Sequence, residues 1–183
     1  MDLIVFAHFD SKGSHNAAVL RHVKARLESE KSPYEVIDLY ADGFDPVLRP
    51  ERQDPLVPKY QAMIKKAKRL IFIYPVWWYN APAILKGFID KVFLPGFAYN
   101  FVNDPVKGFY VDKLLSGREA IVINTYGGGR QWIDAHGNAP MMVMDKAALD
   151  FCGIDVQARI NWFEARGPAE VPNEIKTLID AEL

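Results

Sequence analysis

The feature that most constrains the fold of this chain is a regular alternation of short apolar runs with amphipathic segments. The apolar runs predict strands at residues 3–7, 34–40, 69–74, 119–124 and 154–162. Apolar residues at helical spacing predict helices at residues 15–31, 58–68, 81–93, 139–152 and 173–182. Because the strands are apolar on both faces and each is followed by a helix, we predict a parallel sheet with helices on both sides.

The order of these elements predicts a single domain over residues 1–183, since neither a repeat nor a break in composition divides the chain. The expected fold is a three-layer α/β flavodoxin-like fold with a five-stranded parallel sheet of order 2-1-3-4-5. Two connections look irregular. One is the long segment 95–117, and the other is interrupted by prolines, namely Pro46, Pro50, Pro55 and Pro58.

Local signals refine these elements. Ser14 is the expected N-cap of the first helix, and Asn80 is expected to cap the third helix, with Pro82 in its first turn. Cys152 ends an apolar helix and is interpreted as a core residue. A solvated basic face is expected ahead of the third strand, at Lys65, Lys66, Lys68 and Arg69.

Composition narrows the choice of partners. The net charge is −1, from 22 basic and 23 acidic residues, which gives no electrostatic reason to expect nucleic acid or an anionic membrane. A single cysteine excludes an intrachain disulfide, and four scattered histidines favour no metal site. The first ten residues do not resemble a signal peptide, and no apolar run approaches the roughly 20 residues that span a bilayer. We therefore expect a soluble, cytoplasmic protein without membrane insertion.

Three loops follow the first, third and fourth strands and should meet at one edge of the sheet. In the first loop, Ser14, His15 and Asn16 surround a helix N-terminus that would favour a phosphate, although simple capping by Ser14 explains it about equally well. The last loop contains Gly127, Gly128 and Gly129. These glycines could form an anion-binding nest or let a ligand approach the backbone, and they could also form a flexible turn.

The middle loop is the most informative, because Trp77, Trp78 and Tyr79 follow one another directly. Neighbouring side chains on an extended chain point in different directions, so these three rings cannot all enter the core. They could stack on a flat aromatic ligand or form a protein interface, where Trp and Tyr are also enriched. The three neighbouring loops thus offer a site for a phosphate, a surface for a planar ring and backbone donors. Together they predict a flavin nucleotide.

Four stretches carry a resemblance to a known family: AHFDSKGSHNAAV, DLYADGFDPVL, YPVWWYNAPAILKGFIDKVFLPGFAY and NTYGGG. The sequence resembles the DT-diaphorase type of NAD(P)H:quinone oxidoreductases, including the smaller bacterial relatives associated with potassium efflux. The likeness spans nearly all of residues 1–160, and the third stretch is the specific one. By this resemblance, the flavin-binding residues are His8, Ser14, His15, Asn16, Pro75, Val76, Trp77, Trp78, Tyr79, Thr125, Tyr126, Gly127 and Gly128.

The resemblance also implies a homodimer with the active site at the subunit interface, where Tyr99 and Phe101 would line the substrate pocket. In better-known members, a tyrosine and a histidine after the glycines are proposed to support hydride transfer. Here Trp132 stands about where that tyrosine lies, and His136 is the nearby histidine. Trp132 is therefore assigned to the substrate pocket, and Tyr126 and His136 are the candidate catalytic residues.

The function expected from this resemblance is ping-pong transfer of electrons from NAD(P)H through a bound flavin to a quinone or similar acceptor. The resemblance favours FAD, while the small size of the chain keeps FMN open, and NADH and NADPH are not distinguished. Two alternatives are a flavodoxin-type electron carrier and a regulatory flavoprotein subunit that partners a potassium-efflux transporter. The near-zero net charge disfavours the carrier, because carriers dock through strongly acidic faces.

Overall fold

The computed structural model describes residues 1–49 and 54–183, so Pro50 of the proline-rich connection lies outside the described residues. The strands are β1 (Asp2–Phe6), β2 (Tyr34–Asp38), β3 (Arg69–Pro75), β4 (Tyr99–Asp104), β5 (Gly108–Lys113), β6 (Arg118–Thr125) and β7 (Ile154–Trp162). The α-helices are α1 (His15–Ser29), α2 (Leu56–Lys66), α3 (Ala83–Val92), α4 (Arg130–Ala135), α5 (Ala139–Met141) and α6 (Asn173–Glu182). A π-helical segment, η1 (Met142–Leu149), and a short 3-10 turn, η2 (Asp150–Cys152), continue α5.

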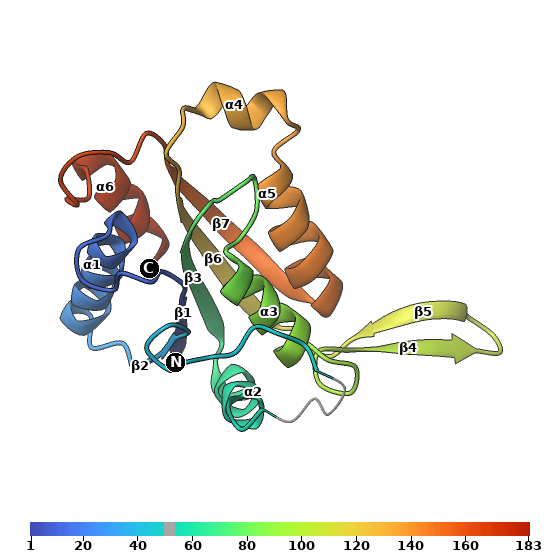
Figure 1. Ribbon diagram of the computed structural model, residues 1–183. Helices are drawn as coiled ribbons and strands as arrows, with labels where there is room; N and C mark the ends of the chain where they lie inside the picture. The colour runs from blue at the N-terminus through green and yellow to red at the C-terminus, as the bar shows by residue number, and fades with distance from the viewer. Residues whose placement is uncertain (50–53) are drawn as a thin grey trace.

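A five-stranded parallel sheet of order β2-β1-β3-β6-β7 forms the centre of the molecule. This confirms the predicted sheet and its order, with β6 and β7 as the expected fourth and fifth strands. Helices α1 and α6 cover one face of the sheet, and α2, α3 and the α5–η1 rod cover the other (Figure 1). The result is the predicted three-layer arrangement.

The two layers of core follow from the two-residue period of a strand. Leu3 and Val5 enter the cluster beneath α2, α3 and η1, whereas Ile4 and Phe6 enter the cluster beneath α1 and α6. All four side chains are completely buried. Burial on both faces explains why the sheet strands read as continuous apolar runs.

The segment 95–117 is not irregular as predicted. It contains an antiparallel hairpin, β4–β5, which projects from the body as a separate arm (Figure 1). The Asp104 carboxylate accepts hydrogen bonds of 2.8 Å from the amides of Val106 and Lys107, and Gly108 has a φ of 76°, so the turn is well specified. The arm was missed because neither strand is buried, and both therefore lack the continuous apolar run of the sheet strands.

Three smaller expectations were wrong. Asn80 does not cap α3, because the helix begins at Ala83 after Pro82, and the Asn80 side chain accepts instead from the amide of Ala81. The glycine loop is followed by the short helix α4, where a loop was expected. Arg69 is not on a solvated face, since its Nε lies 2.8 Å from the Asp2 carboxylate. The Ser14 cap is confirmed by a 3.0 Å bond from the amide of Ala17, and Cys152 is buried as expected.

The predicted helix over residues 139–152 exists as the continuous rod α5–η1–η2, but its middle is π-helical. The buried carboxylate of Asp145 in η1 pairs with the guanidinium of Arg159 on β7, with Nε 2.8 Å from Oδ2. Arg159 also donates to the side chain of Asn124 on β6, which in turn donates to the carbonyl of Tyr74 on β3 over 3.1 Å. This chain of polar contacts ties the rod to the ends of the central strands.

Among residues 1–49 and 54–183, every helix is too short or too polar to cross a membrane. The same residues hold no cluster of three or more His, Cys, Asp or Glu side chains suited to a metal ion.

Candidate flavin site

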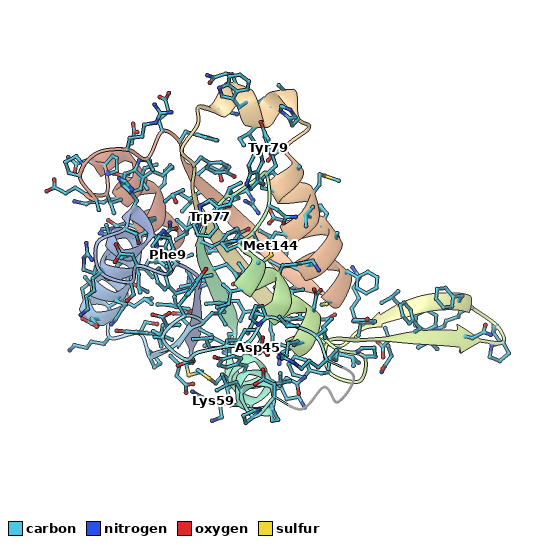
Figure 2. All side chains as sticks on the ribbon, in the orientation of Figure 1. Phe9, Asp45, Lys59, Trp77, Tyr79 and Met144 are labelled. Carbon is cyan, nitrogen blue, oxygen red and sulfur yellow. The ribbon has the colours of Figure 1, made fainter. Side chains whose placement is uncertain are left out.

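The loops that follow β1, β3 and β6 meet around a cavity of about 430 Å³ at the carboxyl edge of the sheet. Trp77 lies there, between Phe9 on one side and Tyr79 on the other (Figure 2). The sequence predicted every lining residue as a cofactor contact except Ala165, and the full set is His8, Ser14, His15, Asn16, Pro75, Val76, Trp77, Trp78, Thr125, Tyr126, Gly127 and Ala165. The predicted convergence of three loops is therefore observed.

One end of the cavity is the N-terminus of α1. Asn16 is 2% exposed, and its side-chain amide donates a 2.7 Å hydrogen bond to Thr125 Oγ1, which joins the first loop to the last. Its Oδ1 is buried without a partner among the described residues, as is Nε2 of His15. Unpaired buried polar atoms are costly, and here they lie beside free first-turn amides and the positive end of the helix dipole. The free amides and His15 Nε2 suit an anionic group at this end of the cavity, whereas Asn16 Oδ1 suits a hydrogen-bond donor.

His8 lies at the rim of the same cavity. Its Nδ1 accepts a 3.0 Å hydrogen bond from the amide of Asp10, and its ring stacks on Phe9 with centroids 4.6 Å apart. Burial lowers the pKa of His8 below its ordinary value, because the charged imidazolium is poorly solvated there. Without a bound anion, the site therefore presents a neutral imidazole.

The aromatic loop is a tight turn with unusual backbone angles. Trp77 and Asn80 exchange two backbone hydrogen bonds of 3.0 Å, and between them Trp78 and Tyr79 both have left-handed φ values, 52° and 57°. Such a turn normally takes Asn or Gly, because a bulky side chain is strained at positive φ. Trp78 is also 96% exposed, so packing within the described chain does not compensate that strain. Strain of this kind is a recurrent sign of a functional loop.

The glycine loop presents its backbone to the cavity. A Cβ added at Gly127 would meet nothing within 4 Å, and no partner among the described residues receives the amides of Gly127, Gly128 and Gly129. These glycines do not have positive φ, which favours close ligand approach over the anion-binding nest. Arg166 holds this loop, because its guanidinium donates two hydrogen bonds, of 2.8 and 3.0 Å, to the Gly127 carbonyl.

A second hollow, of about 260 Å³, continues from the cavity and shares Val76, Trp78, Tyr126 and Gly127 with it. It gathers the remaining predicted residues Tyr79, Gly128 and Trp132, together with Gly129 and Ile133. The ring of His136 packs against that of Tyr79, tilted by 36° with centroids 4.4 Å apart, and its Nδ1 donates to the Trp132 carbonyl over 2.8 Å. The structure therefore places Trp132 in the second hollow and His136 against Tyr79, while His136 itself lines neither the cavity nor the hollow.

Tyr126, the other candidate catalytic residue, is 3% exposed and donates a hydrogen bond of 3.2 Å to Asn161 on β7. Burial raises the pKa of Tyr126 to about 12, so its hydroxyl stays protonated at neutral pH. Its geometry therefore supports a hydrogen-bonding role better than a role in ionisation.

Tyr99 and Phe101 do not line this cavity. They lie on β4, where Tyr99 borders a separate groove with Phe151 and Val143, and Phe101 is exposed and stacks on Phe109. The sequence also gave no signal for Ala165 and Arg166, because the loop after β7 contacts the site only through the fold. Hydrogen bonds from Ala165 to Tyr126 and from Glu164 to Gly128 hold that loop against the glycine loop.

These features define an α/β protein of the doubly wound type with a cavity at its switch point. The chain belongs to the flavodoxin-like fold family, whose model matches residues 3–181.

Named relatives extend this likeness over most of the chain. NAD(P)H dehydrogenase [quinone] 1 of Cavia porcellus is 28% identical over 94% of this chain and 72% of its own length. Ribosyldihydronicotinamide dehydrogenase [quinone] of Mus musculus is 29% identical over 85% of this chain and 78% of its own length. The crystal structure of Smu.1420 from Streptococcus mutans UA159 superposes with a TM-score of 0.79 and 29% identity, covering 99% of this chain and 95% of that protein.

Proposed function

We propose that the protein is a flavin-dependent oxidoreductase that passes electrons from NAD(P)H to a quinone or similar acceptor. The observation that carries this proposal is one cavity lined by the residues expected to hold a flavin, with buried polar atoms at its α1 end that lack a partner in the described part of the chain. The names of the two curated relatives, both quinone-dependent dehydrogenases, support the same activity.

The residues present fit a flavin nucleotide. Ser14, His15 and Asn16 at the α1 N-terminus would hold the phosphate, which would accept hydrogen bonds from the free first-turn amides and from Nε2 of His15. The free amides of Trp78, Tyr79 and the glycine loop would meet the polar edge of the ring system. The aromatic side chains of the second loop would pack against the ring.

A bound flavin supplies the two-electron chemistry, and the chain supplies binding, orientation and electrostatics. The strained turn at Trp78 and Tyr79 would present backbone donors to the ring, and Asn16 joins the first and last loops through Thr125. The ring of His136 lies against Tyr79, where it would hold a proton close to the flavin or the acceptor. A catalytic role for His136 and a binding role for Trp132 are parts of this proposal.

We further propose that the protein is a homodimer whose active site is completed across the interface. Tyr99 and Phe101 lie outside the cavity of their own chain, so they would reach a flavin only in a partner. The arm that carries them exposes Phe101, Val106 and Phe109, an unusual density of large apolar side chains for a free hairpin.

Two measurements test the proposed activity. Heat or acid should release a yellow cofactor whose mass identifies it as FMN or FAD, and the loaded protein should oxidise NADH or NADPH steadily when a quinone is added. Turnover would exclude a pure electron carrier. A colourless protein that binds neither flavin, or a loaded protein inactive with every nicotinamide and quinone pair, would overturn the proposal.

A further inference from the structure

A buried arginine, Arg159 on β7, joins the segments that lead into the site. Its side chain is 8% exposed, and its guanidinium contacts both carboxylate oxygens of Asp145 in η1. The same guanidinium donates to Oδ1 of Asn124 on β6 and lies 3.5 Å from the carbonyl oxygen of Pro140 in α5. One charged group thus contacts the rod at two points and the end of β6 at a third.

On the sheet side, Arg159 reaches two loops of the site through Asn124. This asparagine is completely buried, and its Nδ2 donates to the carbonyl of Tyr74 over 3.1 Å. Thr125 follows Asn124 directly and Pro75 follows Tyr74, and both Thr125 and Pro75 line the cavity. Arg159 therefore holds the strand ends from which the aromatic loop and the glycine loop begin.

On the rod side, the contacts lead to α4, which bridges the loop after β6 and the start of α5 (Figure 1). Asn138 donates its amide to the carbonyl of Ile133 over 3.1 Å, and its own carbonyl accepts from the amide of Met141. Ile133 lines the second hollow, and His136, at the end of α4, packs against Tyr79. A shift of the rod would therefore carry Ile133 and His136 with it.

The chemistry of this joint indicates a role beyond stability. A buried ion pair often contributes no more to stability than apolar residues of similar volume, and its better-attested use is to specify one conformation. The planar guanidinium of Arg159 suits that use, because it contacts Asp145 and Asn124 at once in fixed directions. The rod is also π-helical at this place, since the amide of Asp150 donates to the carbonyl of Asp145 five positions earlier. π-Helical turns occur frequently at functional sites.

We propose that Arg159 is a positioning residue, which sets the place of α4 and His136 relative to the aromatic loop and the glycine loop. This inference rests on the proposed function, in which His136 holds a proton close to the flavin or the acceptor. Arg159 itself lines neither the cavity nor the second hollow, so it acts through its contacts with Asp145 and Asn124.

The test removes the joint and preserves its volume in the double variant Asp145→Leu, Arg159→Met. The matched control is Asp2→Leu, Arg69→Met, because Arg69 also holds an aspartate by two hydrogen bonds, of 2.8 and 3.1 Å, but at the opposite, amino edge of the sheet. If the first double variant does not fold, Arg159→Lys takes its place, since an ammonium keeps the charge and loses the planar fork of donors.

The first measurement uses the apoprotein and does not depend on flavin chemistry. The imidazole C–H resonances of His136, assigned with His136→Gln, should be shifted by the ring of Tyr79, whose centroid lies 4.4 Å away. We expect this shift to fall toward that of a solvated histidine when the Asp145–Arg159 pair is removed, and to persist in the control. A His136 resonance that does not move would overturn the inference.

The second measurement is steady-state turnover of the flavin-loaded protein with NADPH and a quinone. Loss of the Asp145–Arg159 pair should lower kcat at least about tenfold, because a misplaced group no longer assists the reaction, and the control should retain kcat. In the His136→Gln background the same change should have little further effect, since Arg159 acts through His136. Equal losses of kcat in both backgrounds would reduce the pair to a structural role and overturn the inference. If wild type shows no turnover with any quinone, the proposed function fails, while the His136 resonance still decides whether Arg159 positions that residue.

Discussion

Trp78 and Tyr79 hold left-handed backbone angles that are unfavourable for bulky residues. The sequence showed that these rings were not core residues, because three consecutive aromatics cannot share one face. It could not show the turn itself, since no Gly or Asn marks positive φ at this place. The protein has this backbone strain without a ligand, and contacts of the two residues with a ligand would offset it.

We predict that Trp78→Gly is about 1 kcal/mol more stable than Trp78→Ala, because glycine removes the left-handed strain that alanine keeps. Both variants lose the indole, so both should bind flavin more weakly than wild type. Urea unfolding of the apoproteins and fluorescence titration with FMN measure the two effects. Equal stability of the Gly and Ala variants would show that the turn is not strained.

His8 provides a pH prediction. Its pKa in the folded protein lies below the ordinary value of 6.5, so near pH 6 the unfolded chain binds more protons than the folded one. The contribution of His8 to stability is therefore full above that value and is lost as the pH falls below it. In His8→Gln, whose side-chain oxygen can still accept from the Asp10 amide, the loss of stability between about pH 8 and about pH 5 should be smaller than in wild type. Urea unfolding at both pH values tests this, and identical losses would contradict it.

At the scale of elements, a buried ion pair joins the rod α5–η1–η2 to the sheet. The side chains of Asp145 and Arg159 are both more than nine-tenths buried. Arg159 also donates to Asn124, which donates to the carbonyl of Tyr74 near the end of β3. The sequence predicted the helix and the strand, but two charged residues 14 positions apart carry no signal that they meet. Their pairing places the rod beside the ends of β3 and β6.

We predict that Asp145→Leu costs about 3–5 kcal/mol of unfolding free energy, because it leaves the Arg159 guanidinium buried without its counterion. The double variant Asp145→Leu, Arg159→Met removes both charges and should cost less than the single change. Urea unfolding of the two variants and of Arg159→Met completes the cycle. Additive losses would mean that the pair is not coupled.

At the scale of the whole molecule, the β4–β5 arm stands out, because it leaves large apolar side chains exposed in a single chain. Its base is fixed by an ion pair of 3.0 Å between Lys113 and Asp150, and its outer part carries exposed aromatic side chains. An arm of this kind is consistent with the homodimer expected from the sequence resemblance.

If the arm forms the dimer interface, Phe101→Asp should weaken association at least tenfold, because a carboxylate is costly in an apolar contact. Turnover per flavin should fall with it, since Tyr99 and Phe101 would no longer reach the partner's site. Sedimentation equilibrium and steady-state assays measure both effects, with Asp112→Asn as a control that alters the charge of the same arm. A wild-type monomer that retains full activity would contradict the interface.

The sequence by itself determined the fold class, the order of the sheet strands and the three loops of the site. It could do so because strands buried on both faces and helices buried on one face leave different apolar periods in the sequence. Only the tertiary structure decided the contacts that join distant segments: the bond from Asn16 to Thr125, the clamp of Arg166 on Gly127, the Arg159 network and the course of the arm. These depend on which residues the fold brings within hydrogen-bonding distance, and a single polar contact between residues far apart in the chain leaves no periodic pattern to read.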